Sequence, residues 1–412
     1  MRITRLFDAA IVALSLILVV AGCGSTGRTT GEAASSSKPV AEAPRPLRVA
    51  LFPYVPDKKR MEELLIERWR NVSIYPIEFV EFWDGYSSDP TEDLDVFEFD
   101  AMSLEYFVRN GFVAPADPAT VLAPEDIADF AWDAAHVDGV LYGVPRLACT
   151  FALFYRDGDI DLEQAKGLAD LERVLAPEAG GGTPPEAGRG LLIDLTGSTD
   201  CVSLYFDALL DTTGKYCIRP PLPSVAQLDQ NALANLQVLA RTAGRPQATF
   251  EDNTYRQRSQ WFAEGRGRAF VGYTERAGVV PPAATAKWRV RLLPMGTENK
   301  VNMCFVDVLS VSPRLRGERQ AVAQQFVAFA TASETVLACL MPPSDGRTPS
   351  QYLLPVRRSV AADPTLQAAA PLYRDLVWFI DPESNPRAHR FGEEGRAWLE
   401  ANKRAIRAKL FP

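Results

Sequence analysis

The sequence predicts an α/β fold in which two lobes, each with a parallel or mixed sheet and flanking helices, face one another across a central cleft. Three observations lead to this expectation. About 366 of the 412 residues remain once an N-terminal segment is set aside, which is too many for one small domain and typical of two lobes. Apolar residues make up 47% of the chain, enough for a large core. Stretches with strand character alternate with stretches of helical periodicity, the pattern of sheets covered by helices.

The N-terminal segment has the marks of a lipoprotein export signal. Two arginines precede an apolar run over residues 9–20, which ends in Val-Ala-Gly before Cys23. The run is about 12 residues long, shorter than the roughly 20 that span a membrane, and small residues before the cut are typical of secretory signals. We expect residues 1–22 to be removed and Cys23 to carry a lipid. A plain signal peptide and a short membrane anchor are the alternatives.

A tether is expected to follow the cleavage site, over residues 23–46. Beyond Cys23 it consists mainly of Gly, Ser, Thr, Ala and Pro, which cannot bury enough apolar surface to fold. The protein is therefore expected to be exported and held at the membrane, on its periplasmic or cell-surface side, by the lipid on Cys23.

Charge and composition exclude several classes of partner. The formal net charge is −8 and the sequence has no basic stripe, so nucleic acid is not an expected partner. Because the chain has only His136, His389 and no Cys-x-x-Cys motif, neither a metal site nor a cofactor is expected. The cysteines beyond Cys23 are odd in number, so at least one thiol needs an explanation in an oxidising compartment. They are Cys149, Cys201, Cys217, Cys304 and Cys339.

The elements of the first half alternate between strands and helices. Strands are expected over Leu47–Phe52, Ile74–Phe82 and Leu94–Phe99, and helices over Asp57–Trp69 and about Ser103–Arg109. Because ligands of such sheets bind beyond the carboxyl ends of the strands, we expect Tyr54 and Asp100, just past predicted strands, at the cleft.

Two apolar strands further along carry distinctive residues. A turn over Asp138–Pro145 leads into a strand over Arg146–Tyr155 that contains Cys149, and Glu275 follows a strand over Ala269–Tyr273. Both strands resemble the crossing strands of solute-binding proteins, where the chain passes between lobes at the cleft, so the two side chains are expected to face one another. The remaining elements are expected as a surface loop over 176–189, strands over Arg289–Pro294 and Phe305–Ser312, and a helix over about 317–332.

Cys149 and Glu275 form a candidate pair for nucleophilic chemistry. A thiol attacks as a thiolate and therefore needs a base, and with histidine scarce a carboxylate is the natural one. A glutamate in a poorly hydrated cleft has a raised pKa and exchanges protons near neutrality. The alternative is that Cys149 is a small apolar core residue, as most free cysteines are.

Several stretches resemble type I thiaminase, also called thiamine pyridinylase, which has a solute-binding fold. They are LRVALFPYVPD (47–57), DLDVFEFDA (93–101), LYGVPRLACTFALFYR (141–156), GLLIDLTGSTDC (190–201), WFAEGRGRAFVGYTE (261–275) and FVDVLSV (305–311). The similarity extends over about residues 47–345. It implies a transferase that cleaves thiamine at its methylene bridge and replaces the thiazole by an external amine or thiol, through a covalent cysteine–pyrimidine intermediate.

The resemblance also implies roles for individual residues. Cys149 matches the nucleophile and Glu275 the general base, while Asp100 and Asp307 match the acidic residues that hold the aminopyrimidine. Tyrosines that line the cleft and stack on a flat cationic ligand match Tyr54, Tyr86, Tyr255 and Tyr273. As alternatives, the aspartates are helix caps or partners of arginines, and the tyrosines belong to the core or the rim. Phe52 stands where a tyrosine is expected in close relatives, which bears on substrate preference.

The resemblance places the first lobe at 47–147 plus about 277–330, and the second at about 148–276 plus 331–412. The protein is expected to be a monomer, and Cys201 and Cys217 are one candidate disulfide. The competing hypothesis is a non-catalytic solute-binding lipoprotein that delivers thiamine or a related pyrimidine to an importer; a sugar or peptide carrier is a third. A carrier has no need of the Cys149–Glu275 pair, so this pair discriminates between an enzyme and a carrier.

Overall fold

A 10-stranded mixed sheet runs through the protein, whose computed structural model describes residues 44–176, 183–196, 199–213, 222–250, 256–296 and 301–410. The predictions about Cys23, Cys217 and Tyr255 lie outside these residues. The strand order is β2-β1-β3-β10-β6-β8-β7; β9 and β11 also pair with β6, and β12 pairs with β10. The strands are β1 (Leu47–Ala50), β2 (Ile77–Phe79), β3 (Val96–Asp100), β6 (Val144–Arg156), β7 (Ala187–Leu192), β8 (Gly267–Tyr273), β9 (Trp288–Leu292), β10 (Asn302–Val311), β11 (Leu354–Pro355) and β12 (Pro386–Ala388), beside a separate ribbon of β4 (His136–Val137) and β5 (Val140–Leu141).

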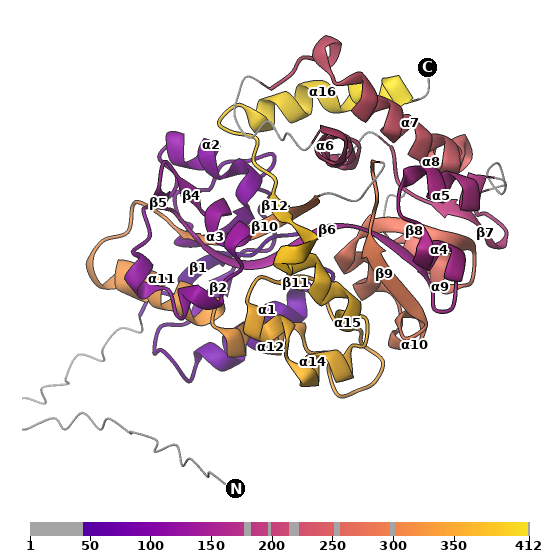
Figure 1. Cartoon of the computed structure of the whole chain (residues 1–412). Coiled ribbons are helices and arrows are strands. Elements are labelled where there is room, and N and C mark those ends of the chain that lie inside the picture. The colour runs from indigo at the N-terminus through magenta and orange to yellow at the C-terminus, as the bar shows by residue number, and fades with distance from the viewer. Residues whose placement is uncertain are drawn as a thin grey trace, which may run out of the picture. The chain divides into compact units, whose positions relative to one another are not determined.

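Helices flank this sheet (Figure 1). Those associated mainly with the N-terminal part and with the returning chain are α1 (Lys58–Trp69), α2 (Leu104–Arg109), α3 (Asp129–Ala134), α10 (Pro282–Thr285), α11 (Gly317–Ala330), α12 (Ser333–Leu340), α13 (Arg358–Ala361), α14 (Pro364–Ala369) and α15 (Tyr373–Leu376). The others are α4 (Ile160–Gln164), α5 (Leu168–Leu175), α6 (Thr199–Thr213), α7 (Gln230–Ala243), α8 (Arg245–Thr249), α9 (Gln257–Ala263) and α16 (Gly395–Leu410). Two short 3-10 turns bear on the site: η1 (Ala101–Ser103) and η6 (Thr274–Val279).

The 13-residue strand β6 joins the two lobes. Its first half pairs with β10 and β11, and its second half pairs with β8 and β9. Figure 1 shows β6 running from the part of the sheet around β1 and β10 to the part around β8 and β9. Two apolar clusters pack on the sheet. One is built on β1, β3, α1 and α11 and extends to Phe154 in the second half of β6 and to Phe270 and Trp288 of its partners β8 and β9, and the other is built on β7, α6, α7 and α16. The predicted two-lobed α/β fold is confirmed, with the refinement that its two sheets are continuous through β6.

Two strands near the N-terminus are shorter than expected, for local reasons. β1 ends at Ala50. Beyond it, the amide of Phe52 donates to the side chain of Glu98, at Oε2 and 3.0 Å, instead of to the backbone of a neighbouring strand. β2 begins only at Ile77, since Pro76 lacks an amide donor and Ile74 is 84% exposed. The predicted strand was therefore longer than β2, because the prediction relied on apolar β-branched side chains alone.

A buried ion pair lies where the crossing strand leaves the first lobe. Arg146 donates to Glu98 through Nε at 2.6 Å and Nη2 at 2.8 Å, and both side chains are 0% exposed. Arg146 is the extra residue at a register shift in β6, because Asp307 pairs with Leu147 whereas Val308 pairs with Pro145. Removing one partner of such a pair leaves an uncompensated buried charge, so the pair fixes β3 against β6 below the cleft.

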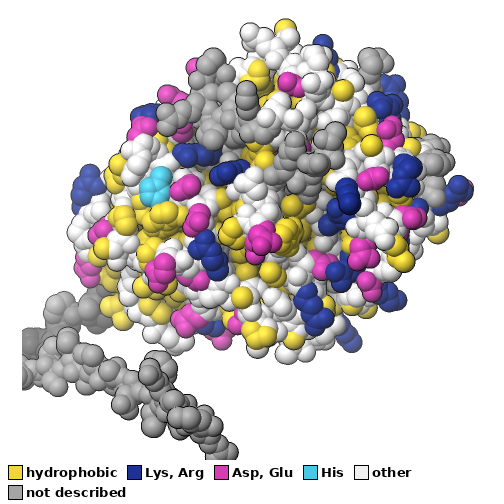
Figure 2. All heavy atoms as spheres, in the orientation of Figure 1, with side chains coloured by type: hydrophobic (Ala, Val, Ile, Leu, Met, Phe, Trp, Pro, Cys, Tyr) yellow, Lys and Arg dark blue, Asp and Glu magenta, His cyan; other side chains and the backbone are white. Residues whose placement is uncertain are grey.

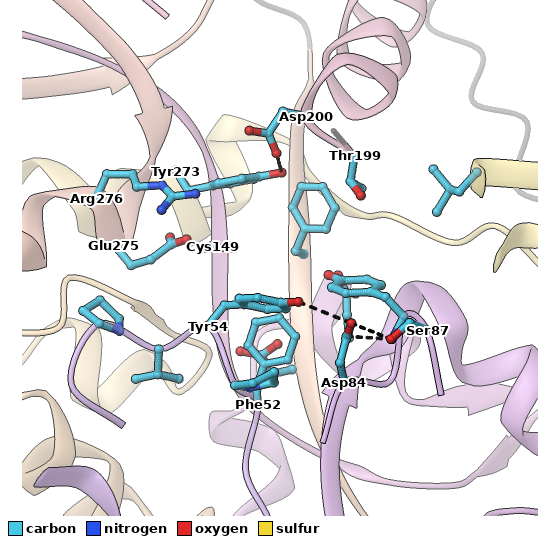
Figure 3. A pocket seen from close by; sticks show the side chains of 18 of the residues that line it. Phe52, Tyr54, Asp84, Ser87, Cys149, Thr199, Asp200, Tyr273, Glu275 and Arg276 are labelled. Atoms are coloured by element: carbon cyan, nitrogen blue, oxygen red, sulfur yellow. Dashed lines mark hydrogen bonds between the residues drawn. The ribbon is translucent and has the colours of Figure 1, made fainter. Parts of the chain in front are cut away.

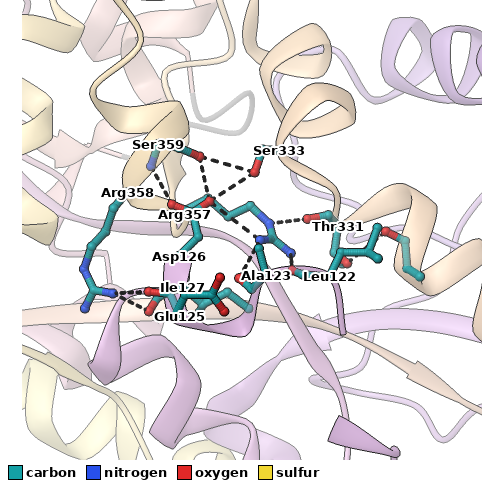
Figure 4. Close-up of polar contacts among 11 residues, drawn as sticks. Leu122, Ala123, Glu125, Asp126, Ile127, Thr331, Ser333, Arg357, Arg358 and Ser359 are labelled. Atoms are coloured by element: carbon teal, nitrogen blue, oxygen red, sulfur yellow. Dashed lines mark hydrogen bonds and ion pairs between the residues drawn. The ribbon is translucent and has the colours of Figure 1, made fainter. Parts of the chain in front are cut away.

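The chain beyond α12 returns to the first lobe before it reaches the second. Arg357 donates to the carbonyls of Leu122 at 2.8 Å and Ala123 at 3.2 Å, and Asp126 accepts from the hydroxyl of Ser359 at 2.6 Å (Figure 4). Side chains from Val336 to Ile380 belong to the first apolar cluster, and those from Phe391 to Leu410 belong to the second. Arg357 and Ser359 thus bind first-lobe residues, whereas Asp375 of α15 binds Val290 and Arg289 of β9, which pairs with the second half of β6. The predicted lobe boundaries stay a prediction, because helical periodicity does not reveal which lobe a helix packs against.

The surface agrees with the mixed charge of the sequence. Figure 2 shows basic and acidic side chains interspersed over the face drawn. Within the described ranges, none of the helices combines the length and apolar content that a membrane span requires.

Candidate active site

The pairing register of four strands brings chemically active side chains onto one face of the sheet. Directly paired residues of neighbouring strands share a face, and so do residues two apart along one strand. The register pairs Asp100 with Asp307 across β3 and β10, Phe305 with Cys149 across β10 and β6, and Phe151 with Tyr273 across β6 and β8. All six side chains therefore belong to the same face. If one strand slipped by one residue, its side chains in this set would point to the opposite face of the sheet.

A cavity of about 480 Å³ lies over this face. Its volume falls in the range of small-molecule sites, about 300–1,000 Å³. Of the eight predicted cleft residues, seven line it: Tyr54, Tyr86, Asp100, Cys149, Tyr273, Glu275 and Asp307. Tyr255 lies outside the described residues. Segments far apart in the chain thus contribute to one cavity, as Asp100 and Asp307 illustrate, which pair across β3 and β10.

Cys149 and Glu275 lie together at one wall of the cavity. Cys149 is on β6, and Glu275 is in η6, the turn that directly follows β8. In Figure 3 the carboxylate of Glu275 lies beside the position of Cys149, and each group shifts the pKa of the other. Glu275 Oε2 is buried and has no hydrogen-bond partner among the described residues. A buried polar atom without a partner is uncommon and is typical of a functional group.

Burial sets the protonation of this pair. Burial raises the pKa of Glu275 to about 7, opposed by the positive charge of Arg276 and by the hydrogen bond with Cys149. Burial, and next the negative charge of Glu275, raise the pKa of the Cys149 thiol well above its ordinary value. The thiol therefore stays protonated at neutral pH unless a base removes its proton. Glu275 gains and loses a proton near pH 7, which suits a general base at that pH.

The histidines are poor alternatives to Glu275 as the base. His389 packs against the ring of Phe305, with ring centres 4.2 Å apart, and is 1% exposed. Burial lowers its pKa to about 3, so its imidazole is a weak base. His136 is hydrogen-bonded through Nδ1 to the carbonyl of Trp132, at 2.7 Å.

Asp100 and Asp307 form an acidic floor. Asp100 ends β3 and caps η1: its Oδ1 accepts from the amide of Met102 at 2.9 Å, and its Oδ2 accepts from the hydroxyl of Tyr86 at 2.7 Å. Burial raises the pKa of Asp100 to about 7, although these hydrogen bonds oppose the shift. Burial, with the negative charges of Glu98 and Asp100, raises the pKa of Asp307 well above its ordinary value. A ligand with a positive ring or several N–H donors stabilises the ionised form of these two carboxyl groups. Such a ligand is therefore favoured here.

The first lobe contributes an aromatic wall. The rings of Phe52, Tyr54 and Tyr86 lie with centres 5.5 to 6.4 Å apart. Tyr54 is 47% exposed at the rim, and its hydroxyl donates to Asp84 Oδ2 at 3.3 Å. A further oxygen of Asp84 accepts from the amide of Tyr86, at 3.0 Å, so this carboxylate fixes the loop.

The second lobe contributes a matching wall. Tyr273 stacks on Phe151 with ring centres 4.2 Å apart and meets the edge of Phe305 at 5.5 Å. Its hydroxyl donates to Asp200 Oδ1 at 2.9 Å (Figure 3). Aromatic faces on both sides favour a flat ligand, and a flat cation most of all.

Several cavity residues escaped the sequence reasoning. Asp84 and Asp200 hold tyrosine hydroxyls, but a lone aspartate in a loop or at a helix start carries no sign of that partner. Phe305 could have been found, since it lies two residues before Asp307 on one strand and shares its face. Arg396, from the C-terminal helix, also lines the cavity, and nothing in the sequence pattern links it to the cleft. In the described part of the chain, no group of three or more His, Cys, Asp and Glu side chains is arranged to hold a metal ion.

Comparison with known proteins adds independent findings. The Thiaminase-1 domain model matches residues 150–295. Thiaminase-1 of Paenibacillus thiaminolyticus is 32% identical over 406 residues, covering 97% of this chain and 95% of that protein. Clostridium botulinum thiaminase I in complex with thiamin has a TM-score of 0.82 and 30% identity, covering 89% of this chain and 100% of that chain. The GacH receptor of Streptomyces glaucescens, at a TM-score of 0.65 and 16% identity over 90% and 94% of the two chains, shares the fold.

Proposed function

The chain belongs to the thiaminase I family, and on that premise we propose that it is a transferase that cleaves thiamine and replaces the thiazole by an external amine or thiol. The observation that carries the proposal is the contact of Cys149 with Glu275 above the acidic floor of Asp100 and Asp307. A protein that only carries a ligand has no need of a thiol beside a carboxyl base.

The acidic floor is proposed to hold the aminopyrimidine half of thiamine. Carboxylates accept hydrogen bonds from the amino group and stabilise a protonated ring nitrogen. Their raised pKa values mean that a bound cation draws protons off Asp100 and Asp307, which strengthens each contact as it forms. The aromatic walls of Tyr86 and Tyr273 then flank a flat ring between the lobes.

The chemistry is proposed to begin with the thiol. Glu275 removes the proton of Cys149 and releases it to solvent, and the thiolate adds to the pyrimidine ring, forming an S–C bond and placing an electron pair on the ring. That pair displaces the thiazole from the methylene bridge, and the thiazole leaves with the electrons of the broken C–N bond. The intermediate is a pyrimidine held covalently on Cys149.

The second half restores the enzyme. The nucleophile attacks the bridge carbon while Glu275 takes its proton, and the electrons returning through the ring expel the sulfur of Cys149. Glu275 passes the nucleophile's proton to that sulfur. In sum, cationic thiamine and a neutral nucleophile give the substituted pyrimidine, neutral thiazole and one proton, with no change in oxidation state.

We predict that purified protein releases free thiazole from thiamine in the presence of an amine such as aniline. Cys149→Ser should lower kcat by about 10³-fold or more, because the hydroxyl is far less acidic, while the Kd for thiamine stays within about threefold. The assay is chromatography of the thiazole product. Tight binding of thiamine by wild type, without thiazole release with any amine or thiol tried, would instead favour the carrier.

The same assay tests the base through its pH profile. Because the pKa of Glu275 is raised to about 7, its basic form is lost as pH falls through 7, so kcat/KM should fall below about pH 7. Glu275→Gln should be severely impaired and lose this acid limb. Asp100 also has a pKa raised to about 7, so Asp100→Asn must keep the limb if Glu275 causes it. Glu264→Gln, at an exposed position, serves as the matched control.

We predict that the floor aspartates bind the pyrimidine. In a Cys149→Ser background, Asp100→Asn and Asp307→Asn should each weaken thiamine binding by about 1–3 kcal/mol, the cost of losing a buried charged hydrogen bond. Isothermal calorimetry measures this, with Asp129→Asn, at a side chain 89% exposed, as the control. Unchanged affinity in both floor variants would assign these aspartates a structural role only.

We also propose that the enzyme is exported and anchored by a lipid on Cys23, from the signal pattern over residues 9–23. In a bacterial host that processes lipoproteins, intact mass should show a mature chain that begins at Cys23 and carries the lipid. Cys23→Ala should move the protein from the detergent phase to the aqueous phase. A mature N-terminus elsewhere, without lipid, would refute the anchor.

A further inference from the structure

The C-terminal helix α16 packs on the second lobe and reaches the first through Arg396. Leu399, Ile406 and Leu410 belong to the second apolar cluster, and Trp398 Nε1 donates to the carbonyl of Pro223 at 2.8 Å. Figure 1 shows α16, in yellow, beside α6 and α7, with its N-terminal end on the side of α2. Residues of the first turn of α16 are thereby held at the mouth of the cleft.

Arg396 makes its contacts across the cleft, in the first lobe. Its Nε donates to the carbonyl of Tyr86 at 3.1 Å, and its Nη1 pairs with Asp89 Oδ1 at 2.8 Å. Its guanidinium carbon lies 4.4 Å from the centre of the Tyr106 ring, and the Tyr106 hydroxyl donates to the same oxygen of Asp89 at 3.0 Å. One side chain of the second lobe thus holds a loop and a helix of the first.

This contact differs from an ordinary surface ion pair. The Arg396 side chain is 13% exposed, lines the cavity and lies over an aromatic ring. A guanidinium that donates to two acceptors and also contacts a ring face is more constrained than an exposed pair, and a lysine cannot reproduce both kinds of contact. Removing the guanidinium of Arg396 should therefore displace the loop that contains Tyr86 and Asp89.

The loop leads directly to the pyrimidine floor. The amide of Tyr86 is held by Asp84, its carbonyl is held by Arg396, and its hydroxyl donates to Asp100 Oδ2 at 2.7 Å. Burial of Tyr86, together with the charge of Asp100, raises the pKa of the Tyr86 phenol, so it remains a donor. A shift of the loop moves the hydroxyl that orients the floor carboxylate.

We infer that Arg396 is a positioning residue: from the opposite lobe it holds the Tyr86 loop, and it thereby keeps the Tyr86 hydroxyl on Asp100 for recognition of the pyrimidine. The inference rests on the proposed function, because it takes the pyrimidine to bind at Asp100.

A double-mutant cycle tests the inference on binding alone. In the Cys149→Ser background, the Kd for thiamine is measured by calorimetry for Arg396→Gln, Tyr86→Phe and the double variant. Arg396→Gln should raise Kd about tenfold, because the floor carboxylate loses its orientation. In the Tyr86→Phe background, which lacks the hydroxyl, the same change should add no more than about twofold. Arg396→Lys should fall between wild type and Arg396→Gln, and Arg404→Gln, exposed on the same helix, should match wild type.

Two results would overturn the inference: a Kd within twofold of the parent for Arg396→Gln, or an equal loss in both backgrounds, which marks a contact that does not act through Tyr86. If Arg396→Gln fails to fold by circular dichroism, Asp89→Asn, at a side chain 46% exposed, replaces it in the same cycle. If wild type binds thiamine but releases no thiazole, the proposed function is wrong. The double-mutant cycle on the Kd for thiamine would still decide the role of Arg396.

Discussion

The site depends above all on the register in which β3, β10, β6 and β8 pair. Each pairing carries one side chain of the site opposite another, so that Asp100 and Asp307 share a face with Cys149 and Tyr273. Because strand side chains alternate, the register is an all-or-none condition: a slip of one residue would bury the thiol on the wrong side. The buried Arg146–Glu98 pair lies at the register shift just before this stretch of β6 and links it to β3.

Acid groups that are concentrated on a buried face are harder to ionise than acid groups in water. The proposed chemistry depends on the raised pKa values that result. Burial raises the pKa values of Asp100, Glu275 and Cys149, so these groups hold protons that solvated groups would release. A cationic substrate reverses the balance, since its charge favours the ionised carboxylates. The same desolvation that disfavours a free thiolate also brings Glu275 into the range of a base at neutral pH. Binding and activation therefore follow from one physical property of the cleft.

The sequence predicted the position at the cleft of residues that lie on strands or directly follow them. Asp100 ends a strand, and Glu275 and Cys149 belong to the two apolar strands that cross between lobes, so strand patterning and the family resemblance both pointed to them. The tyrosine partners Asp84 and Asp200 could not be predicted, because a hydrogen bond to a hydroxyl far along the chain leaves no periodic signal. The contacts of Arg357 with the carbonyls of Leu122 and Ala123 could not be predicted either, since they join segments more than 230 residues apart. Arg396 shows the same limit: its partners are set by where α16 docks.

The account stands or falls on a covalent intermediate at Cys149, and trapping that intermediate is its most direct test. Wild type would be mixed with thiamine and a poor nucleophile, quenched in acid during turnover, and examined by intact mass and peptide mapping. The account predicts a mass gain of the aminopyrimidine with its methylene, without the thiazole, on the peptide that contains Cys149, and no such gain in Cys149→Ser. Thiazole release with the adduct on another residue, or with no adduct on Cys149 at any quench time, would contradict it.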